Sequence, residues 1–216
     1  TEALLRLTQA EQTFEFDDVE EQPVPALFRG FSAPVRIQAD WSIDDLQRLI
    51  TSEEDGFLRW DALQTLALLA VDEAISGREK AALSALIASI QAILEQDGDR
   101  AVLATSLILP SENYIAEVHS QSQGADPIAI HTARESVKAS LATALIDHFE
   151  VLANITIEGA YAPEGAAIAE RALRLTALDY LRFVQPDKAA DIAISLLEKS
   201  DNLTDRLGAL RTLGAV

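Results

Sequence analysis

The sequence contains no cysteine and no methionine, and it has only nine glycines among its 216 residues. Without cysteine, disulfides, thiolate nucleophiles and thiolate metal ligands are all excluded, and a reducing compartment is compatible with the chain. The absence of methionine, even as an initiator, leads us to expect that these residues are a piece of a longer protein.

Long apolar runs are absent as well. No run reaches the roughly 18 residues that a membrane-spanning helix needs. The first stretch, TEALLRLTQAEQ, lacks the basic flank and apolar centre of a secretory signal. We therefore expect no membrane partner.

Basic residues are scarce, with 17 Lys and Arg against 35 Asp and Glu, which gives a net charge of -18. A chain of this charge repels phosphate backbones and anionic lipid surfaces, so we expect no nucleic-acid partner. The remaining composition, 49% hydrophobic and 24% charged, is typical of a folded domain with a core of its own.

The first forty residues have the features of strands. From Glu11 to Val19 the letters EQTFEFDDV alternate between polar and aromatic positions, which predicts a half-buried strand. In the next stretch, QPVPALFRGFSAPVRI at 22–37, three prolines exclude helix interiors, and 34–38 is predicted as a second strand. A sheet this small is marginal alone, so it must pack on something else.

After Asp40 the periodicity becomes helical. Ser42 and Asp45 form a capping-box pattern at the start of a first helix that runs to about residue 50. Eight further segments carry apolar residues three and four positions apart: 56–76, 79–96, 99–108, 111–119, 127–155, 164–184, 187–199 and 203–213. Short connections favour antiparallel neighbours, so the predicted fold class is mainly α, an ARM- or HEAT-like α-solenoid. The last segment carries Leu210, Leu213 and Val216 without a polar cap, so we expect the array to be incomplete there.

Candidate catalytic groups are few. The three histidines, His119, His131 and His148, are 12 and 17 residues apart, and no His-Glu-x-x-His motif is present. His131 and Glu135 share a helix face, but two ligands without a third are more typical of a solvated polar pair. There is neither a Gly-x-Ser-x-Gly elbow nor a glycine-rich phosphate loop. We therefore assign no catalytic, metal-binding or cofactor-binding residue, and substrate-binding residues stay unknown.

Two other patterns have simple structural interpretations. Acidic runs at 17–18, 20–21, 44–45 and 53–55 fall at strand ends and helix starts, where negative charge is stabilised by free backbone donors or keeps the surface soluble. Arg59 and Trp60 could form a cation–π site. Trp60 also shares a helix stripe with Leu63, Leu66 and Ala67, and core packing is the favoured interpretation.

Six stretches, in order along nearly the whole chain, resemble the bacterial aminopeptidase N family of zinc-dependent alanyl aminopeptidases. They are EQTFEFDDVEEQPVPALFRGFSAPVRI at 11–37, WSIDDLQRLI at 41–50, DGFLRWDALQTLA at 55–67, LPSENYIAE at 109–117, DPIAIHTARE at 126–135 and NLTDRLGAL at 202–210. The first is the most specific, because secondary-structure propensity alone would not generate its order of motifs. Leu203 departs from the family, whose members tend to have methionine there.

The resemblance implies a place within a larger enzyme. Family members have a β domain, a thermolysin-like catalytic domain, a small β-sandwich and a large helical domain. Residues 1–38 are similar to the C-terminal strands of the β-sandwich, and residues 39–216 are similar to the first part of the helical domain. The zinc motif and the Gly-Ala-Met-Glu-Asn motif of the family have no counterpart in these 216 residues. No cofactor is therefore expected in this chain, and zinc is expected in the full-length parent.

The function that the resemblance implies is non-catalytic. The helical domain of the family covers the catalytic domain and encloses the cavity in which the parent removes N-terminal residues from peptides. The expected partners are the catalytic domain of the same chain and the parent's peptide substrates, and the expected location is the bacterial cytoplasm. The alternative is a free-standing α-solenoid that binds partner peptides on its concave face.

Overall fold

The computed structural model describes residues 3–20, 22–32, 35, 37, 39–96, 98–120, 124, 126–157, 159 and 161–216. Within these residues a short 3-10 helix, η1 (Arg29–Phe31), precedes ten α-helices. Their bounds are α1 Ile43–Ser52, α2 Gly56–Ser76, α3 Ala81–Leu94, α4 Arg100–Ser106, α5 Glu112–Ser120, α6 Pro127–Ala144, α7 Ile146–Ala153, α8 Gly165–Leu181, α9 Pro186–Lys199 and α10 Leu203–Leu213. The prediction of a mainly helical chain is confirmed.

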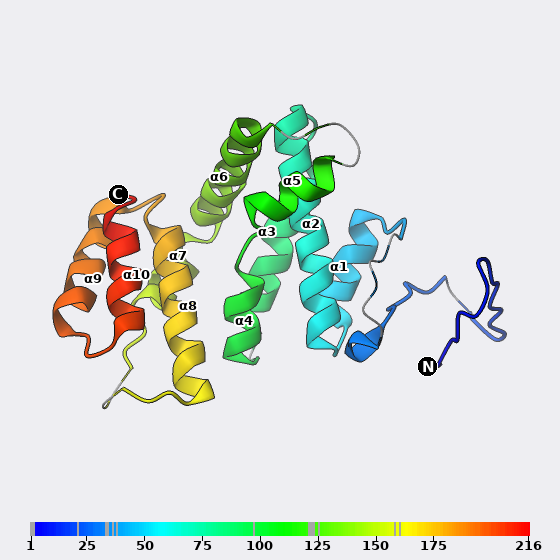
Figure 1. Cartoon of the computed structure of the whole chain (residues 1–216), viewed down its shortest axis with the longest axis horizontal. Coiled ribbons are helices and arrows are strands. Elements are labelled where there is room, and N and C mark those ends of the chain that lie inside the picture. Colours follow the sequence, from blue (N-terminus) through cyan, green and yellow to red (C-terminus); the bar gives the residue numbers. More distant parts are fainter. Residues whose placement is uncertain are drawn as a thin grey trace.

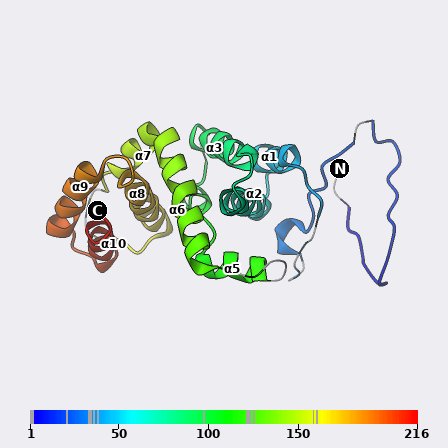
Figure 2. The same cartoon turned by 90° about the horizontal axis from the view of Figure 1, so that it is seen from above.

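Most of the helices stand side by side in a row, α5 lies across them, and the N-terminal segment extends away from one end of the row (Figure 1). Seen from above, α1, α3, α7 and α9 form one layer, and α2, α8 and α10 lie beside them in a second (Figure 2). Helix α2 packs on α1, α3, α4 and α6, while α8 packs on α4, α7, α9 and α10. Helix α2 is therefore the centre of the N-terminal half of the stack, and α8 is the centre of its C-terminal half.

Hydroxyl, carboxylate and amide side chains cap the first turns of several helices. Ser42 and Asp45 form the predicted capping box of α1, with Asp45 N–H donating to Ser42 Oγ at 3.1 Å. The Ser42 hydroxyl and amide donate to the Asp45 carboxylate and lower its pKa. Asp55 accepts from Leu58 N–H at the start of α2, which lowers the pKa of Asp55. For these two residues the interpretation of acidic runs as helix starts is confirmed.

One predicted helix is two helices in the structure. The segment 127–155 breaks at Leu145 (φ -119°, ψ 24°) into α6 and α7, which are separate in Figure 2. Leu145 is buried, and its carbonyl accepts from both His148 and Phe149 N–H at 3.1 Å. The turn keeps Leu145 in the core while α7 packs along α8. The apolar periodicity continues through the turn, so the pattern did not reveal it.

The strand predicted over 11–19 is not formed, and no other strand is present in the described residues. Phe14 is half-buried, but Phe16 is 61% exposed. A strand requires a hydrogen-bonded neighbour, and the described part of this chain provides none. The second predicted strand, 34–38, has residues 34, 36 and 38 outside the described residues.

The η1 segment is fastened to the start of α2. Gly30 N–H donates to Asp55 Oδ2 at 2.7 Å, and Arg29 Nη2 lies 3.0 Å from Glu53 Oε1. Gly30 has a φ of 65°, a conformation that glycine adopts without steric cost. The segment before η1 also contributes to the core, since Val24 and Ala26 pack on it. Among the described helices, none combines the length and apolar character needed to span a membrane.

A glycine sets the close approach of α10 to α8. A Cβ atom on Gly208 would lie 2.4 Å from Leu175 Cδ2 and 3.0 Å from Leu175 Cγ. Contacts this short force the leucine side chain out of its place. With Leu175 in its observed position, there is therefore no room for a side chain at residue 208.

We expect Gly208→Ala to lower the free energy of unfolding by about 1–2 kcal/mol, since the clash outweighs the helix propensity gained from alanine. Urea denaturation measures this change. In a Leu175→Ala background the clash is removed, and the same substitution should become neutral or stabilising. Gly165→Ala, where a Cβ meets no atom within 4 Å, is the control. Equal effects of Gly208→Ala in both backgrounds would contradict this account.

Candidate functional site

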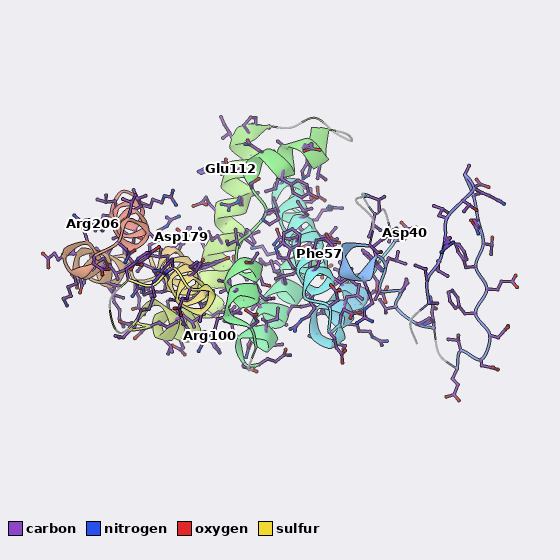
Figure 3. The ribbon with its side chains drawn as sticks, turned by 60° about the horizontal axis from the view of Figure 1, so that its bottom comes forward. Asp40, Phe57, Arg100, Glu112, Asp179 and Arg206 are labelled. Carbon is purple, nitrogen blue, oxygen red and sulfur yellow. The ribbon has the colours of Figure 1, made fainter. Side chains whose placement is uncertain are left out.

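The most elaborate polar site in the described residues lies between α6 and α8 and comprises Arg134, Glu135, Lys138, Asp179 and Arg182, which we call the α6–α8 cluster. Lys138 lies among apolar α6 residues, and its side chain is only 9% exposed. Its ammonium forms a close ion pair with Asp179 Oδ2. Figure 3 labels Asp179 beside α8.

Aromatic rings surround the cations of the cluster. Lys138 Nζ lies 5.4 Å from the ring centroid of Tyr180 and 5.6 Å from that of Phe183. Arg182 Cζ lies 4.1 Å from the Phe183 centroid. These distances are within the range of cation–π attraction, which partly replaces the water that Lys138 loses on burial.

Arginines complete the connection between three segments. Arg182 Nε donates to Asp179 Oδ1 at 2.8 Å, and Arg182 Nη2 lies 3.4 Å from Glu135 Oε2. Arg134 Nε donates to the carbonyl of Pro110 at 2.8 Å, in the connection between α4 and α5. The cluster therefore joins α6 both to α8 and to the connection between α4 and α5.

The electrostatics of the cluster favour ion pairing over proton transfer. Burial lowers the pKa of Lys138, while Asp179 opposes that change by favouring the charged ammonium. Burial also disfavours the Asp179 carboxylate, but Lys138 and Arg182 outweigh it and hold the pKa of Asp179 below its ordinary value. The Asp179 carboxylate therefore stays ionised near neutral pH and, because Lys138 and Arg182 both pair with it, it is not a free general base.

A second buried ion pair joins α8 to α10. Arg174 Nη2 lies 2.7 Å from Asp205 Oδ1, and both side chains are less than one-tenth exposed. The contact has ion-pair distance without hydrogen-bond geometry, and Asp205 Oδ2 instead accepts from Asn202 Nδ2 at 2.8 Å. Arg174 Nη1 also donates to the Ile155 carbonyl at 3.3 Å. This pair ties the connection before α8 to the start of α10.

The histidines lie on three different helices. His119, in the last turn of α5, has its Nε2 atom 3.8 Å from Asp72 Oδ1. His131 Nδ1 lies 2.8 Å from Glu112 Oε1, so its partner is on α5 and not the Glu135 that shares its own helix face. His148, on α7, is half-buried. In the part of the chain that the structure describes, no three His, Asp or Glu side chains are placed to hold a metal ion.

Arg59 and Trp60 do not form a pair with each other. Arg59 donates through Nε to the Ile50 carbonyl at 3.0 Å and through Nη2 to Gln96 Oε1 at 3.1 Å. Trp60 is half-buried, and its ring centroid lies 5.8 Å from that of Phe57. The core prediction is therefore correct for Leu63, Leu66 and Ala67, which are buried, and overstated for Trp60.

A pocket of about 430 Å³ lies between the end of α3, the start of α4 and α7. Its walls are Leu94, Gln96, Gly98, Arg100, Leu103, Asp147, His148, Val151 and Leu152. Arg100, labelled in Figure 3, reaches Glu170 with its Nε 3.6 Å from Oε1. Arg100 thus pairs with a carboxylate of α8 that is not one of the lining residues of the pocket.

The sequence patterns missed the residues of both ion-paired sites. Lys138 interrupts an otherwise apolar stripe on α6, and Arg171 and Arg174 interrupt that of α8. A charge at a core position is the available signal, because such a group is almost never buried unless it is paired. The partner cannot be read from the pattern, since Asp179 is 41 residues from Lys138.

Removing Asp179 should cost more stability than removing Lys138. Asp179→Asn leaves a buried ammonium without its counter-ion, and we expect a loss of about 2 kcal/mol in the free energy of unfolding, reduced because the Asp179 side chain is 46% exposed. Lys138→Met keeps the volume and removes the buried charge, with an expected cost below about 1 kcal/mol. Chemical denaturation of both variants decides the order, and a larger loss for Lys138→Met would refute it.

At acid pH the native chain and the Asp179→Asn variant should have the same free energy of unfolding. Because its folded pKa is lowered from 3.8, Asp179 stabilises the fold above its unfolded pKa, and this contribution is lost as pH falls through the folded pKa. The gap in unfolding free energy should be constant near neutral pH and narrow below about pH 4. A gap that persists unchanged to pH 2 would show that Asp179 acts through packing alone.

Two family models together match nearly all of the sequence. Residues 43–216 match "Domain of unknown function (DUF3458_C) ARM repeats", and residues 1–40 match "Domain of unknown function (DUF3458) Ig-like fold". The first match covers more than half of the chain and confirms the ARM-like fold class that the helical spacing predicts.

Curated relatives and a solved structure agree with these matches. The chain is 35% identical to Aminopeptidase N of Escherichia coli over 213 residues and 34% identical to that of Caulobacter vibrioides over 228, covering 96% and 100% of this chain. It spans about a quarter of the length of these relatives, 24% and 25%. The crystal structure of Legionella pneumophila aminopeptidase A in complex with aspartic acid has the same fold, with a TM-score of 0.81 over 93% of this chain and 24% of that one, at 23% identity. The chain belongs to the DUF3458_C family of ARM-repeat domains, preceded by the end of a DUF3458 Ig-like domain, and corresponds to the C-terminal region of bacterial aminopeptidase N.

Proposed function

We propose that this chain is a non-catalytic part of a zinc metalloaminopeptidase that removes N-terminal residues from peptides, in which it covers the catalytic domain and shapes the substrate cavity. The observation that carries the proposal is the similarity to Aminopeptidase N along 96% of the chain but only 24% of that relative. The sequence also has no His-Glu-x-x-His motif among its 216 residues.

The residues present here do not fit the zinc ion of such an enzyme. The three histidines are on separate helices. Among the described residues, no group of three or more His, Asp or Glu side chains could hold a metal ion. Zinc in the parent polarises a carbonyl and activates water, and we assign its ligands to residues outside this chain. The share of this region is to exclude water and long substrates from the cavity.

Ion pairs between helices support the proposed role of a cover. The α6–α8 cluster and the Arg174–Asp205 pair fasten α6, α8 and α10 at fixed spacing. Residues 1–38 are the proposed end of the neighbouring β-sandwich domain, and the exposure of Leu4, Leu7 and Phe16 is consistent with side chains that pack there. The proposed partners are the catalytic domain of the same parent chain and its peptide substrates, in the bacterial cytoplasm.

A chimera tests this role. In Escherichia coli aminopeptidase N, this chain would replace the matching quarter of the enzyme, and hydrolysis of alanine 4-nitroanilide would be compared with that of peptides of three to twelve residues. We expect zinc-dependent activity on the anilide to be retained and the ratio of long-peptide to short-peptide hydrolysis to change. The isolated chain with added zinc is the control and should show background hydrolysis only.

Two results would contradict the proposal. Activity of the isolated chain that a chelator removes would place catalytic groups in these 216 residues. An active, stable chimera with the native ratio of long-peptide to short-peptide hydrolysis would show that this region does not shape the substrate cavity. Micromolar binding of a random heptapeptide library by the isolated chain would favour a free-standing peptide-binding solenoid instead.

A further inference from the structure

The pocket between α3, α4 and α7 has a volume of about 430 Å³, which is within the range of small-molecule sites. The described residues that line it all lie between positions 94 and 152, so neither α1 nor α10 forms any part of it. Helix α8 packs on both α4 and α7 and holds these two walls in place. The pocket is therefore preformed by the packing of the middle of the chain.

Part of the pocket surface is apolar. The apolar lining residues come from all three helices and are Leu94, Leu103, Val151 and Leu152. On α7, Val151 and Leu152 follow Asp147 and His148 after one turn, so these four residues share one face of the helix. Val151 is 71% exposed, and a ligand with an apolar side chain would remove this area from water.

Hydrogen-bond donors line the wall formed by the end of α3 and the start of α4. Gln96 Oε1 accepts from Arg59 Nη2 at 3.1 Å, which leaves the amide nitrogen of Gln96 as a donor without a partner among the described residues. Arg100, labelled in Figure 3, has its Nε atom 3.6 Å from Glu170 Oε1, and its side chain is 50% exposed. Within the described chain its two Nη atoms form no hydrogen bond, so this wall can bind a carboxylate.

The wall formed by α7 has the opposite charge. Asp147 is exposed in the first turn of α7, and its carboxylate has no hydrogen bond or ion pair with any described residue. His148 beside it is half-buried, and its ring also has no partner in the part of the chain that the structure describes. Glu150 of the same helix, in contrast, pairs with Lys188 of α9. Asp147 is therefore available to an ammonium group from outside the chain.

We propose that this pocket binds a small zwitterion with an apolar side chain, either an amino acid or a dipeptide. In this arrangement Arg100 and Gln96 bind the carboxylate, and Asp147 binds the ammonium group. The apolar side chain of the ligand covers Val151 and the neighbouring leucines. The proposal rests on the pocket and not on the proposed role as a cover, so either of the two can fail without the other.

Other small ligands fit the pocket less well. A phosphate would meet the carboxylate of Asp147 beside a single strong cation, because Arg100 is the one Lys or Arg among the described lining residues. A divalent metal ion would lack ligands, since no three His, Asp or Glu side chains of the described residues are placed to hold one. A purely apolar ligand would take water from Arg100 and Asp147 without pairing either of them.

Four ligands test the proposal on the whole chain. L-leucine has all three features, whereas glycine lacks the apolar side chain, L-leucinamide lacks the carboxylate and N-acetyl-L-leucine lacks the ammonium group. Amide chemical shifts in ¹H–¹⁵N NMR spectra follow each titration, and Gly98, which lines the pocket, reports binding there. We expect L-leucine to shift the Gly98 signal and the other three to bind about fivefold more weakly. L-leucyl-L-leucine in the same titration shows which of the two zwitterions binds more tightly.

Variants assign the two charged contacts. Arg100→Gln should weaken L-leucine about fivefold and remove most of the difference between L-leucine and L-leucinamide. Asp147→Asn should do the same for L-leucine and N-acetyl-L-leucine. The matched controls, Arg48→Gln and Asp187→Asn, change exposed residues of other helices and should retain the native affinities. Asp187, like Asp147, lies in the first turn of its helix.

Three results would overturn the proposal. The first is a Gly98 signal that neither L-leucine nor L-leucyl-L-leucine shifts up to the solubility limit of each ligand. The second is equal binding of L-leucine and its three analogues. The third is an affinity for L-leucine that both Arg100→Gln and Asp147→Asn leave unchanged, with circular dichroism establishing that each variant is folded.

Discussion

Tyr180 is the contact on which the centre of the stack depends. Its side chain is buried, its ring lies 4.3 Å from that of Phe149 at an interplanar angle of 3°, and its hydroxyl donates to the Leu107 carbonyl at 2.7 Å. One residue of α8 thus contacts α7 through its ring and the end of α4 through its hydroxyl. Burial raises the pKa of Tyr180, so the phenol stays protonated and remains a donor. Because water cannot replace the Leu107 carbonyl at this depth, the hydrogen bond adds a directional constraint to the packing of α4 on α8.

The charges around Tyr180 extend this constraint outward. Lys138 lies over the same ring and brings Asp179, Arg182 and Glu135 with it, so that α6 is attached where α8 is already fixed. The chain has about twice as many acidic as basic residues. Several of its few cations lie between two helices, where each forms an ion pair with a carboxylate of the other helix. Two of these cations, Lys138 and Arg174, are buried, and a buried cation is costly unless it is paired, so these two ion pairs favour one arrangement of their helices over others. The acidic surplus remains for the rest of the surface, where it keeps the chain soluble.

Local signals predicted the helices well and the long-range contacts poorly. For α2 and α10 the expected bounds are those observed, because Asp55 and Asn202 cap their starts and apolar spacing defines their lengths. The break at Leu145 was missed because a buried leucine, with no glycine or proline, makes the turn in order to remain in the core. Alternation at 11–19 predicted a strand whose partners are not among the described residues, so the pattern was present without the pairing. The α6–α8 cluster could not be predicted from the sequence, because Lys138 and Asp179 are far apart in the chain and only the fold brings them together.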